Sequence, residues 1–332
     1  MIVFLRKNNH FLCPNPIVSF YLYGKFLKLK DKQALITPTL KGFILLIAAA
    51  FLWAVHGPLA KYLFNNGILP SDLVQARITY SFFALLLVFT ITNRQLFIIE
   101  FRDLAYFALL GIGGFALAQF TYFYAISKID VGVAVALQYT APTLIVLYNY
   151  FILKESISTR IVLAIGLALL GCYLVIGAYH TDIKDLNWVG ILVGVASAFT
   201  FAFYTVYSKK GLAKYNTWTV FFYVLLFASL FWNLIHPPLV LIGQGHNYTT
   251  WLMVLSVAIF GTLLPFTFFL IGVKLLDPVR ATVTATLEPI FATIIAFLFL
   301  GEQLHFWQLL GDFFIVGSIL LMSLKKKKEE KE

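Results

Sequence analysis

The sequence predicts an all-α polytopic membrane protein whose ten transmembrane helices form two inverted five-helix repeats. Three observations lead to this fold class. Apolar residues make up 61% of the 332 residues and charged residues 12%, which leaves too little polar material to cover a water-soluble globule. Ten apolar runs are long enough to cross a bilayer, and one motif recurs at a constant spacing along the chain.

The ten runs are separated by short polar breaks and begin near residue 42. A transmembrane helix needs roughly 20 apolar residues, which is about the length of each run. The ~10-residue alternating segments typical of outer-membrane strands are absent from the sequence. The expected spans are 42–63, 72–92, 104–126, 131–152, 159–179, 187–208, 217–236, 250–273, 279–300 and 305–324.

The basic residues indicate how the spans are oriented. If the N-terminus is cytoplasmic, all but four of the 25 Lys and Arg residues fall in the two tails and the even-numbered loops. The four exceptions are Lys61, Lys128 and Lys184 outside and Arg77 within a span. Because cytoplasmic loops of membrane proteins are enriched in basic residues, we expect both termini to be cytoplasmic in the cell membrane. This asymmetry explains the net charge of +10 without a nucleic-acid partner.

The recurring motif relates the two halves of the chain. Pro142 precedes Pro289 by 147 residues (289 − 142 = 147), and Glu155 precedes Glu302 by the same separation (302 − 155 = 147). That spacing encloses five spans, and an odd number of crossings inverts the second copy in the membrane. Inverted repeats of this kind place a binding site near the midplane and expose it alternately to each side. The sequence therefore favours a transporter.

The repeats also set the expected domain boundaries. We expect a tail at residues 1–40, a first repeat at 41–180, a second repeat at 187–324 and a charged cytoplasmic tail at 325–332. Three interpretations of the first tail stay open: a disordered segment, an interfacial segment on the membrane surface, or an extension upstream of the true start site. Cys13 and Cys172 are the two cysteines, and they indicate neither a disulfide framework nor a metal site.

Residues 40 to 324 resemble the EamA-type branch of the drug/metabolite transporter superfamily. The most specific matches are LEPIFATIIAFLFLGEQL followed by LLGDFFIVG, and the earlier APTLIVLYNYFILKES followed by IGLALLG. The resemblance implies ten spans in two five-helix repeats, a central cavity, and movement of small metabolites such as amino acids, often outward. Further support comes from Trp53, Lys61, Pro70 and Arg77.

Glu288, next to Pro289, is the first candidate for a functional residue. It lies about 14 Å into the ninth span at 1.5 Å per residue, near the bilayer centre. A carboxylate at that depth must be protonated, paired or hydrated. Two readings follow: Glu288 takes up a coupling proton or contacts a substrate ammonium group, or it bonds backbone groups freed by Pro289. The Glu-Pro pair of the resembling family favours the structural or gating role.

Polar and charged residues in other spans complete the candidate pathway. His56 lies beside Pro58, where a kink would expose backbone carbonyls. Arg77 could snorkel to the outer surface or pair with Asp312, which lies at a similar depth in the tenth span. The remaining pathway candidates are Gln119, Tyr122, Gln138 and Pro289, and the predicted helix kinks are Pro58, Pro142 and Pro289.

Other classes of membrane protein remain as alternatives. An intramembrane enzyme would need a catalytic set, and no HExxH, GxSxG or DDxxD-like motif occurs, so we expect no enzymatic activity. The sequence contains no carbonyl-filter motif of the kind that ion channels use. A non-transporting sensor or chaperone remains an alternative. The expected partners are a small-molecule substrate and the lipid bilayer, with a coupling proton and a homodimer left open, and no cofactor or metal.

Overall fold

The computed structural model describes residues 6–7, 10–11, 37–177, 187–237, 243–300 and 305–323. The chain divides into two units, Met1–Lys41 and Gly42–Glu332. In the first unit, β1 (Arg6–Lys7) pairs antiparallel with β2 (His10–Phe11). The expectations for the rest of the first tail and for the charged tail lie outside the described residues, and so does Glu302.

The first repeat contains five helical segments, of which the third and fourth are composite. The 3-10 helices η1 and η2 lie in the connection after the second segment, and η3 is a π-helix. In chain order the elements are α2 (Pro38–Asn65), α3 (Pro70–Thr92), η1 (Arg94–Phe97), η2 (Phe101–Asp103), α4 (Leu104–Ala108), η3 (Leu109–Ala116), α5 (Leu117–Lys128), α6 (Val131–Gln138), α7 (Ala141–Phe151) and α8 (Thr159–Val175).

The second repeat has the same organisation. Side chains at the helix starts provide several caps: Asn187 accepts from Gly190 N–H, Asn216 from Trp218 N–H and Asn247 from Thr250 N–H. In chain order the elements are α9 (Trp188–Lys214), α10 (Thr217–Ile235), α12 (Tyr248–Ala258), the π-helix η6 (Ile259–Leu263), α13 (Leu264–Leu275), α14 (Pro278–Ala285), α15 (Glu288–Leu300) and α16 (Phe306–Ser323).

The predicted helical membrane architecture is confirmed. Within the described residues, 8 helical stretches are long and apolar enough to cross a membrane. The 17-residue α8 and the divided pair α14 and α15 occupy the two other expected positions. Large apolar side chains such as Leu87, Leu192 and Phe313 are more than half exposed on the outside, as expected for a surface that faces lipid.

The composite helices occur at matching places in the two repeats. The third segment of each repeat contains a π-helix, η3 and η6, flanked by α-helix on both sides. The fourth segment of each repeat is divided, by a turn after Gln138 in the first and by a turn after Ala285 in the second. Each later half begins with a proline in its first turn, Pro142 or Pro289, where the missing N–H costs nothing.

The predicted prolines therefore act in two different ways. Pro142 and Pro289 each lie in the first turn of a helix that follows a two-residue turn in the span, so the predicted kinks fall at these turns. Pro58 lies inside α2, which is helical from Pro38 to Asn65. The breaks at Pro142 and Pro289 bring short polar segments into the middle of the bundle, and these segments form part of the site described next.

Candidate functional site

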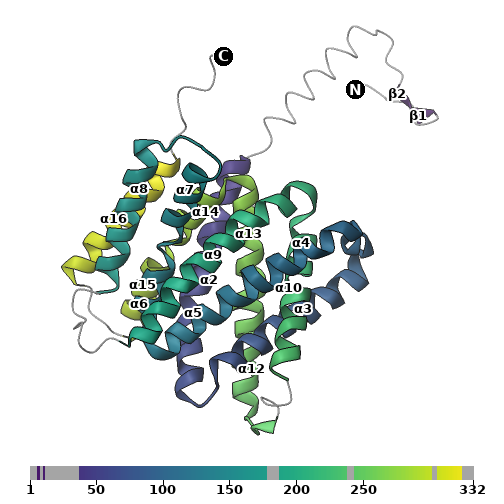
Figure 1. The fold of residues 1–332 in the computed structure, drawn as a ribbon, viewed down its shortest axis with the longest axis horizontal. Helices are drawn as coiled ribbons and strands as arrows, with labels where there is room; N and C mark the ends of the chain where they lie inside the picture. The colour runs from purple at the N-terminus through teal and green to yellow at the C-terminus, as the bar shows by residue number, and fades with distance from the viewer. Residues whose placement is uncertain are drawn as a thin grey trace. The chain divides into compact units, whose positions relative to one another are not determined.

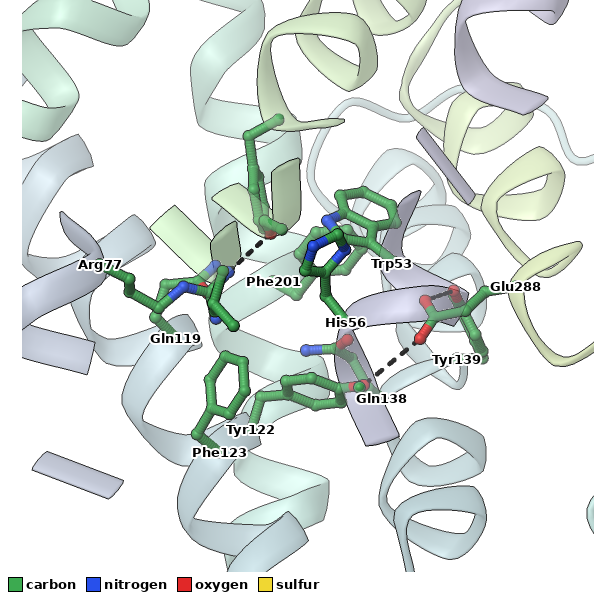
Figure 2. Close-up of a pocket in the computed structure, with 14 residues that line it drawn as sticks. Trp53, His56, Arg77, Gln119, Tyr122, Phe123, Gln138, Tyr139, Phe201 and Glu288 are labelled. Atoms are coloured by element: carbon green, nitrogen blue, oxygen red, sulfur yellow. Dashed lines mark hydrogen bonds between the residues drawn. The ribbon is translucent and has the colours of Figure 1, made fainter. Parts of the chain in front are cut away.

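A pocket lies within the bundle, with a volume of about 520 Å³ that includes the space where it opens to solvent. Both repeats contribute to it. Figure 2 shows Arg77 and Glu288 on opposite sides of the pocket, with His56, Gln138 and Tyr122 between them. The lining residues are Trp53, His56, Gly57, Arg77, Gln119, Tyr122, Phe123, Gln138 and Tyr139 from the first repeat, and Phe201, Val257, Gly261, Phe266 and Glu288 from the second.

Arg77 of α3 is held inside the bundle and is only 2% exposed. Its Nε donates to Thr262 Oγ1 at 2.6 Å and its Nη2 donates to the Gly261 carbonyl at 2.7 Å. The guanidinium carbon lies 4.3 Å from the centre of the Phe123 ring. Its Nη1 has no hydrogen-bond partner among the described residues. The predicted snorkelling of Arg77 to the outer surface is therefore wrong.

The π-helix η6 explains why Arg77 lies where it does. Gly261 and Thr262 both belong to η6, and Thr262 Oγ1 donates to the Val257 carbonyl at 3.0 Å. Such widened turns inside α-helices occur often at functional sites because they rearrange backbone groups. Gly261 packs against His56, since a Cβ at position 261 would lie 3.0 Å from His56 Cβ. The turn thus brings two acceptors to Arg77 while leaving room for His56.

Glu288 is the first residue of α15 and is 7% exposed. The Tyr139 hydroxyl lies 2.6 Å from Glu288 Oε2 and 2.8 Å from the Ala285 carbonyl oxygen. The Tyr122 hydroxyl donates to Glu288 Oε1 at 3.4 Å. No cation forms an ion pair with Glu288 within the described part of the chain. The carboxyl group therefore has two neutral partners and no opposite charge.

The Tyr139 hydroxyl can serve its two neighbours in two ways. It carries one hydrogen, so it cannot donate to Glu288 and to the Ala285 carbonyl at once. When Glu288 is ionised, Tyr139 donates to the carboxylate. When Glu288 is protonated, the carboxyl donates to Tyr139, which then donates to Ala285. Both arrangements fit the same distances, so the site accepts either charge state of Glu288 without moving heavy atoms.

The other predicted pocket residues also line the pocket. His56 Nδ1–H donates to the Leu52 carbonyl at 2.7 Å, and Nε2 lies 3.2 Å from Ser256 Oγ. Gln119 and Tyr122 of α5 point to the same pocket, as their spacing on one helix predicts. Gln138 is the last residue of α6 and lies just before the break in the fourth span.

Asp312 is separate from this group. It lies half-buried on α16, next to Gly311, and it is not among the residues that line the pocket. Its Oδ1 has no hydrogen-bond partner among the described residues. The predicted Arg77–Asp312 pair is not formed, because the contacts of Arg77 are with η6 and Phe123. Two residues at a similar depth in different helices need not be in contact.

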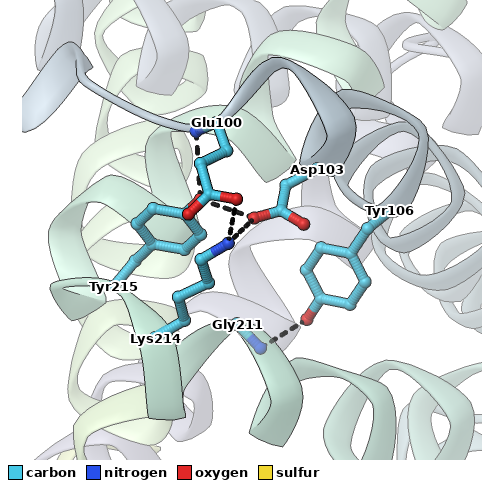
Figure 3. Close-up of polar contacts among 6 residues, drawn as sticks. All are labelled: Glu100, Asp103, Tyr106, Gly211, Lys214 and Tyr215. Carbon is cyan, nitrogen blue, oxygen red and sulfur yellow. Dashed lines mark hydrogen bonds and ion pairs between the residues drawn. The ribbon is translucent and has the colours of Figure 1, made fainter.

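A polar cluster joins the repeats at the end of the bundle predicted to be cytoplasmic (Figure 3). Lys214 Nζ, at the end of α9, lies 2.7 Å from Glu100 Oε2 and 2.8 Å from Asp103 Oδ2. The Tyr215 hydroxyl donates to Asp103 Oδ2 at 2.5 Å. Nearby, Tyr106 donates to the Tyr207 carbonyl and accepts from Gly211 N–H at 2.9 Å. We call Glu100, Asp103, Lys214 and Tyr215 the inner cluster.

A second polar cluster joins α3 to α10 and the segment that follows it, at the opposite end. Asp72 is fully buried, with Oδ1 2.5 Å from His236 Nε2 and Oδ2 accepting from Gln244 at 3.1 Å. One turn or so deeper, Gln75 donates to Asn233 Oδ1 at 2.7 Å. We call Asp72, His236, Gln244, Gln75 and Asn233 the outer cluster. The pocket thus lies between two sets of polar contacts that connect the repeats.

Several of these residues escaped the sequence prediction. Tyr139 was detectable in principle, because it lies in the turn that matches the one before Glu288. The π-helical residues Gly261 and Thr262 carry no such signal, since a Gly-Thr pair is ordinary in an apolar helix. Asp72 and Lys214 lie at helix ends, where charged residues need no special explanation, and their partners are more than 100 residues away.

A sequence model of the EamA-like transporter family matches the chain twice, at residues 40–177 and 188–324. The chain belongs to this family. The two matches of the EamA-like model correspond to the two helical repeats. Both sides of the pocket of this EamA-like protein therefore come from segments that the family model recognises.

Known relatives of this EamA-like protein are membrane transporters. The uncharacterized inner membrane transporter YicL of Salmonella typhimurium is 25% identical over 296 residues, which cover 87% of this chain and 97% of YicL. The threonine/homoserine exporter RhtA of Escherichia coli is 25% identical over 218 residues, 64% of this chain and 69% of RhtA. A solved crystal structure matches the fold with a TM-score of 0.68 at 22% identity, over 86% of this chain and 96% of that one.

Proposed function

We propose that this protein carries small organic metabolites across the cell membrane by alternating access. The observation that carries the proposal is the buried pocket between the repeats, which bears polar and charged side chains from both of them. A pocket at the interface of inverted repeats can open to one side and then to the other when one repeat rocks against the other. The proposal includes cytoplasmic termini, as the basic residues predict.

The two polar clusters support such a cycle. The inner cluster ties η2 and the residue before it to the end of α9, and the outer cluster ties α3 to α10. Both sets of contacts join the first repeat to the second. Opening either end requires that its cluster separate, while the cluster at the other end stays formed. The inner and outer clusters thus act as the two gates of the proposed transport cycle.

The substrate class that we propose is amino acids or related compounds, moved outward. The support comes from the resemblance to the EamA-type branch and from RhtA, whose name describes a threonine/homoserine exporter. The pocket has a suitable character, because it combines aromatic walls with amide, hydroxyl and charged groups. Trp53 and Phe201 provide apolar surface, while Gln119 and Gln138 offer hydrogen bonds to a polar solute.

We also propose that protons drive the cycle through Glu288. The support is the arrangement of Tyr139, which suits both the ionised and the protonated carboxyl group. The titratable or charged groups that face Glu288 are Tyr122 of α5, Tyr139 after α6 and Cys172 of α8, with His56 and Arg77 in the same pocket.

Counterflow in liposomes tests the transport function. Purified full-length protein is reconstituted into liposomes loaded with unlabelled threonine, and uptake of labelled threonine is followed after dilution. Transient accumulation is expected, because only alternating access exchanges solute across a membrane without net driving force. A panel of other amino acids and amines follows in the same assay. Absence of counterflow with every solute would favour the sensor or chaperone alternative.

Proton coupling has its own test in the same liposomes. A pH gradient is expected to drive labelled solute in wild-type protein, and any solute exchange that Glu288→Gln retains is expected not to respond to the gradient. Glu155→Gln, which changes an exposed carboxyl after α7, is the matched control and should respond as wild type does. An unaltered response of Glu288→Gln would remove the proton from the mechanism and leave the carrier function standing.

A further inference from the structure

The pocket contains a buried cation and a buried anion that do not neutralise each other. Arg77 and Glu288 are 2% and 7% exposed, and they form no ion pair with one another in the described structure. A charge that is removed from water and left without a counter-charge is costly, so each group favours an opposite charge that enters the pocket. The two groups come from different repeats, α3 in the first and α15 in the second.

The guanidinium group of Arg77 is held in a fixed orientation, but some of its hydrogen-bond donors are unused. A guanidinium has five N–H donors, and the contacts to Thr262 and Gly261 use one on Nε and one on Nη2. Both acceptors are neutral, so they fix the plane of the group without cancelling its charge. Nη1 is buried and has no partner in the described residues. A planar carboxylate is the ligand that such a fixed guanidinium binds best.

Glu288 has the complementary properties. Its neighbours Tyr122 and Tyr139 are neutral hydroxyl groups, at 3.4 Å and 2.6 Å. An ionised carboxylate offers about four lone-pair sites, so two such contacts leave acceptors for a further donor. An ammonium group supplies three N–H donors and the missing positive charge.

Two aromatic rings keep the charged groups apart. The guanidinium of Arg77 lies over Phe123, the Phe123 and Tyr122 ring centroids are 5.3 Å apart, and the Tyr122 hydroxyl reaches Glu288. Figure 2 shows the same order across the pocket. The two charges therefore lie at separate places along one aromatic wall of the same pocket.

We propose that the pocket recognises zwitterions, with Arg77 binding the carboxylate and Glu288 binding the ammonium group. This inference rests on the proposed transport function and specifies its substrate. A monoanion would leave Glu288 either unpaired or protonated, and a monocation would leave Arg77 unpaired, so each of these solutes makes one charge-assisted contact fewer than a zwitterion. A solute with both charges satisfies both subsites and leaves the filled pocket neutral. The selectivity then comes from the charges left unpaired by the wrong solute.

Four small molecules of matched size provide the test. The isomers 2-aminobutyrate and 4-aminobutyrate are zwitterions with short and long charge separation, while butyrate and butylamine each carry one of the two charges. Binding to the purified full chain in nanodiscs is measured by ligand-observed NMR titration. At least one isomer is expected to bind roughly 10-fold or more tightly than both single-charge molecules, since a charge-assisted contact contributes about 1.5–3 kcal/mol.

Substitutions assign each charge to its subsite. Glu288→Gln is expected to bind aminobutyrate no more tightly than butyrate. Arg77→Gln is expected to bind aminobutyrate no more tightly than butylamine. Arg77→Lys, which keeps the charge, is expected to retain part of that preference, and it serves as the folded comparison if Arg77→Gln is unstable. Glu155→Gln and Arg94→Gln change exposed groups and should leave all four affinities unchanged. A merely structural role would weaken the four ligands alike.

The outcomes separate this inference from the transport function. If wild-type protein binds butyrate or butylamine with the same affinity as the tighter-binding aminobutyrate isomer, the zwitterion site is overturned. Counterflow of other solutes would in that case keep the carrier function. Zwitterion binding without counterflow of any solute would support the site and overturn the carrier.

Discussion

Arg77 Nε donates to Thr262 Oγ1 at 2.6 Å, so a π-helical turn of the second repeat orients the buried guanidinium of the first. Thr262→Val removes this acceptor while keeping the side-chain volume. We expect the affinity for a carboxylate-bearing solute to fall about 10-fold, because a hydrogen bond to a charged group contributes about 1.5–3 kcal/mol. Binding of 4-aminobutyrate and counterflow measure the effect.

Thr267→Val is the matched control for that substitution. Thr267 is also fully buried, in the adjacent α13, and its hydroxyl donates to the Leu263 carbonyl one helical turn away. It has no contact with Arg77, so its loss should leave solute affinity unchanged. Equal losses for the two variants would mean that Thr262 supports the helix and does not orient Arg77.

Gly261 is predicted to tolerate no side chain. A Cβ there would lie 3.0 Å from His56 Cβ and 3.1 Å from His56 Cγ, so Gly261→Ala must displace His56 or the π-helical turn. Overpacking of this kind costs about 1–3 kcal/mol, and we expect a lower melting temperature in detergent together with slower counterflow. Gly166→Ala in α8 meets nothing within 4 Å and is expected to be neutral or stabilising by up to about 1 kcal/mol. Indistinguishable melting curves for the two variants would contradict the predicted contact.

Tyr139→Phe removes the hydroxyl shared by Glu288 and the Ala285 carbonyl. The acceptor that this hydroxyl serves is then left without its donor in a buried setting, which costs about 1–3 kcal/mol. We expect a measurable loss of thermal stability and slower exchange in the counterflow assay. Tyr150→Phe, on an exposed face of α7, should behave as wild type. A Tyr139→Phe protein with wild-type stability would show that the hydroxyl bonds are not formed.

Lys214→Ala separates the inner cluster by removing both ion pairs at once. The effect on stability should be small, because the lysine is partly exposed. We expect instead that the pocket opens more often toward the predicted cytoplasmic end. Labelling of Gln119→Cys by a membrane-impermeant maleimide in inside-out vesicles, with Cys13 and Cys172 replaced, measures this opening. The exposed Lys209→Ala is the control, and equal labelling in both variants would exclude the inner cluster as a gate.

The fold could be predicted because hydrocarbon imposes length and hydrophobicity on every span. The recurrence of Pro142 and Pro289 at one spacing revealed the duplication, since the same local break is needed in both repeats. Glu288 could be singled out for a similar reason, because a carboxyl group at mid-membrane depth always needs a partner or a proton. The hydrophobic environment thus makes both the helices and their exceptions visible in the sequence.

The partners of the buried groups could not be predicted. Arg77 had two plausible solutions at the sequence level, an outward path and Asp312, and the structure has neither. Its actual acceptor, Thr262, is 185 residues away and lies in a π-helical turn that no residue type marks. The same holds for Asp72 and His236, whose contact depends on how α3 and α10 pack. Such contacts depend on how the helices pack against one another, and this packing cannot be read from the pattern of one sequence.

The two repeats also meet at α8 and α16, the last helix of each, which lie side by side (Figure 1). A Cβ on Gly171 would lie 2.7 Å from the Gly311 carbonyl oxygen, and a Cβ on Gly311 equally 2.7 Å from the Gly171 carbonyl oxygen. Backbones in such contact cannot slide past each other without a clash. We therefore expect the last helix of each repeat to form a stationary pivot, about which the helices that carry Arg77 and Glu288 swing through the larger arc.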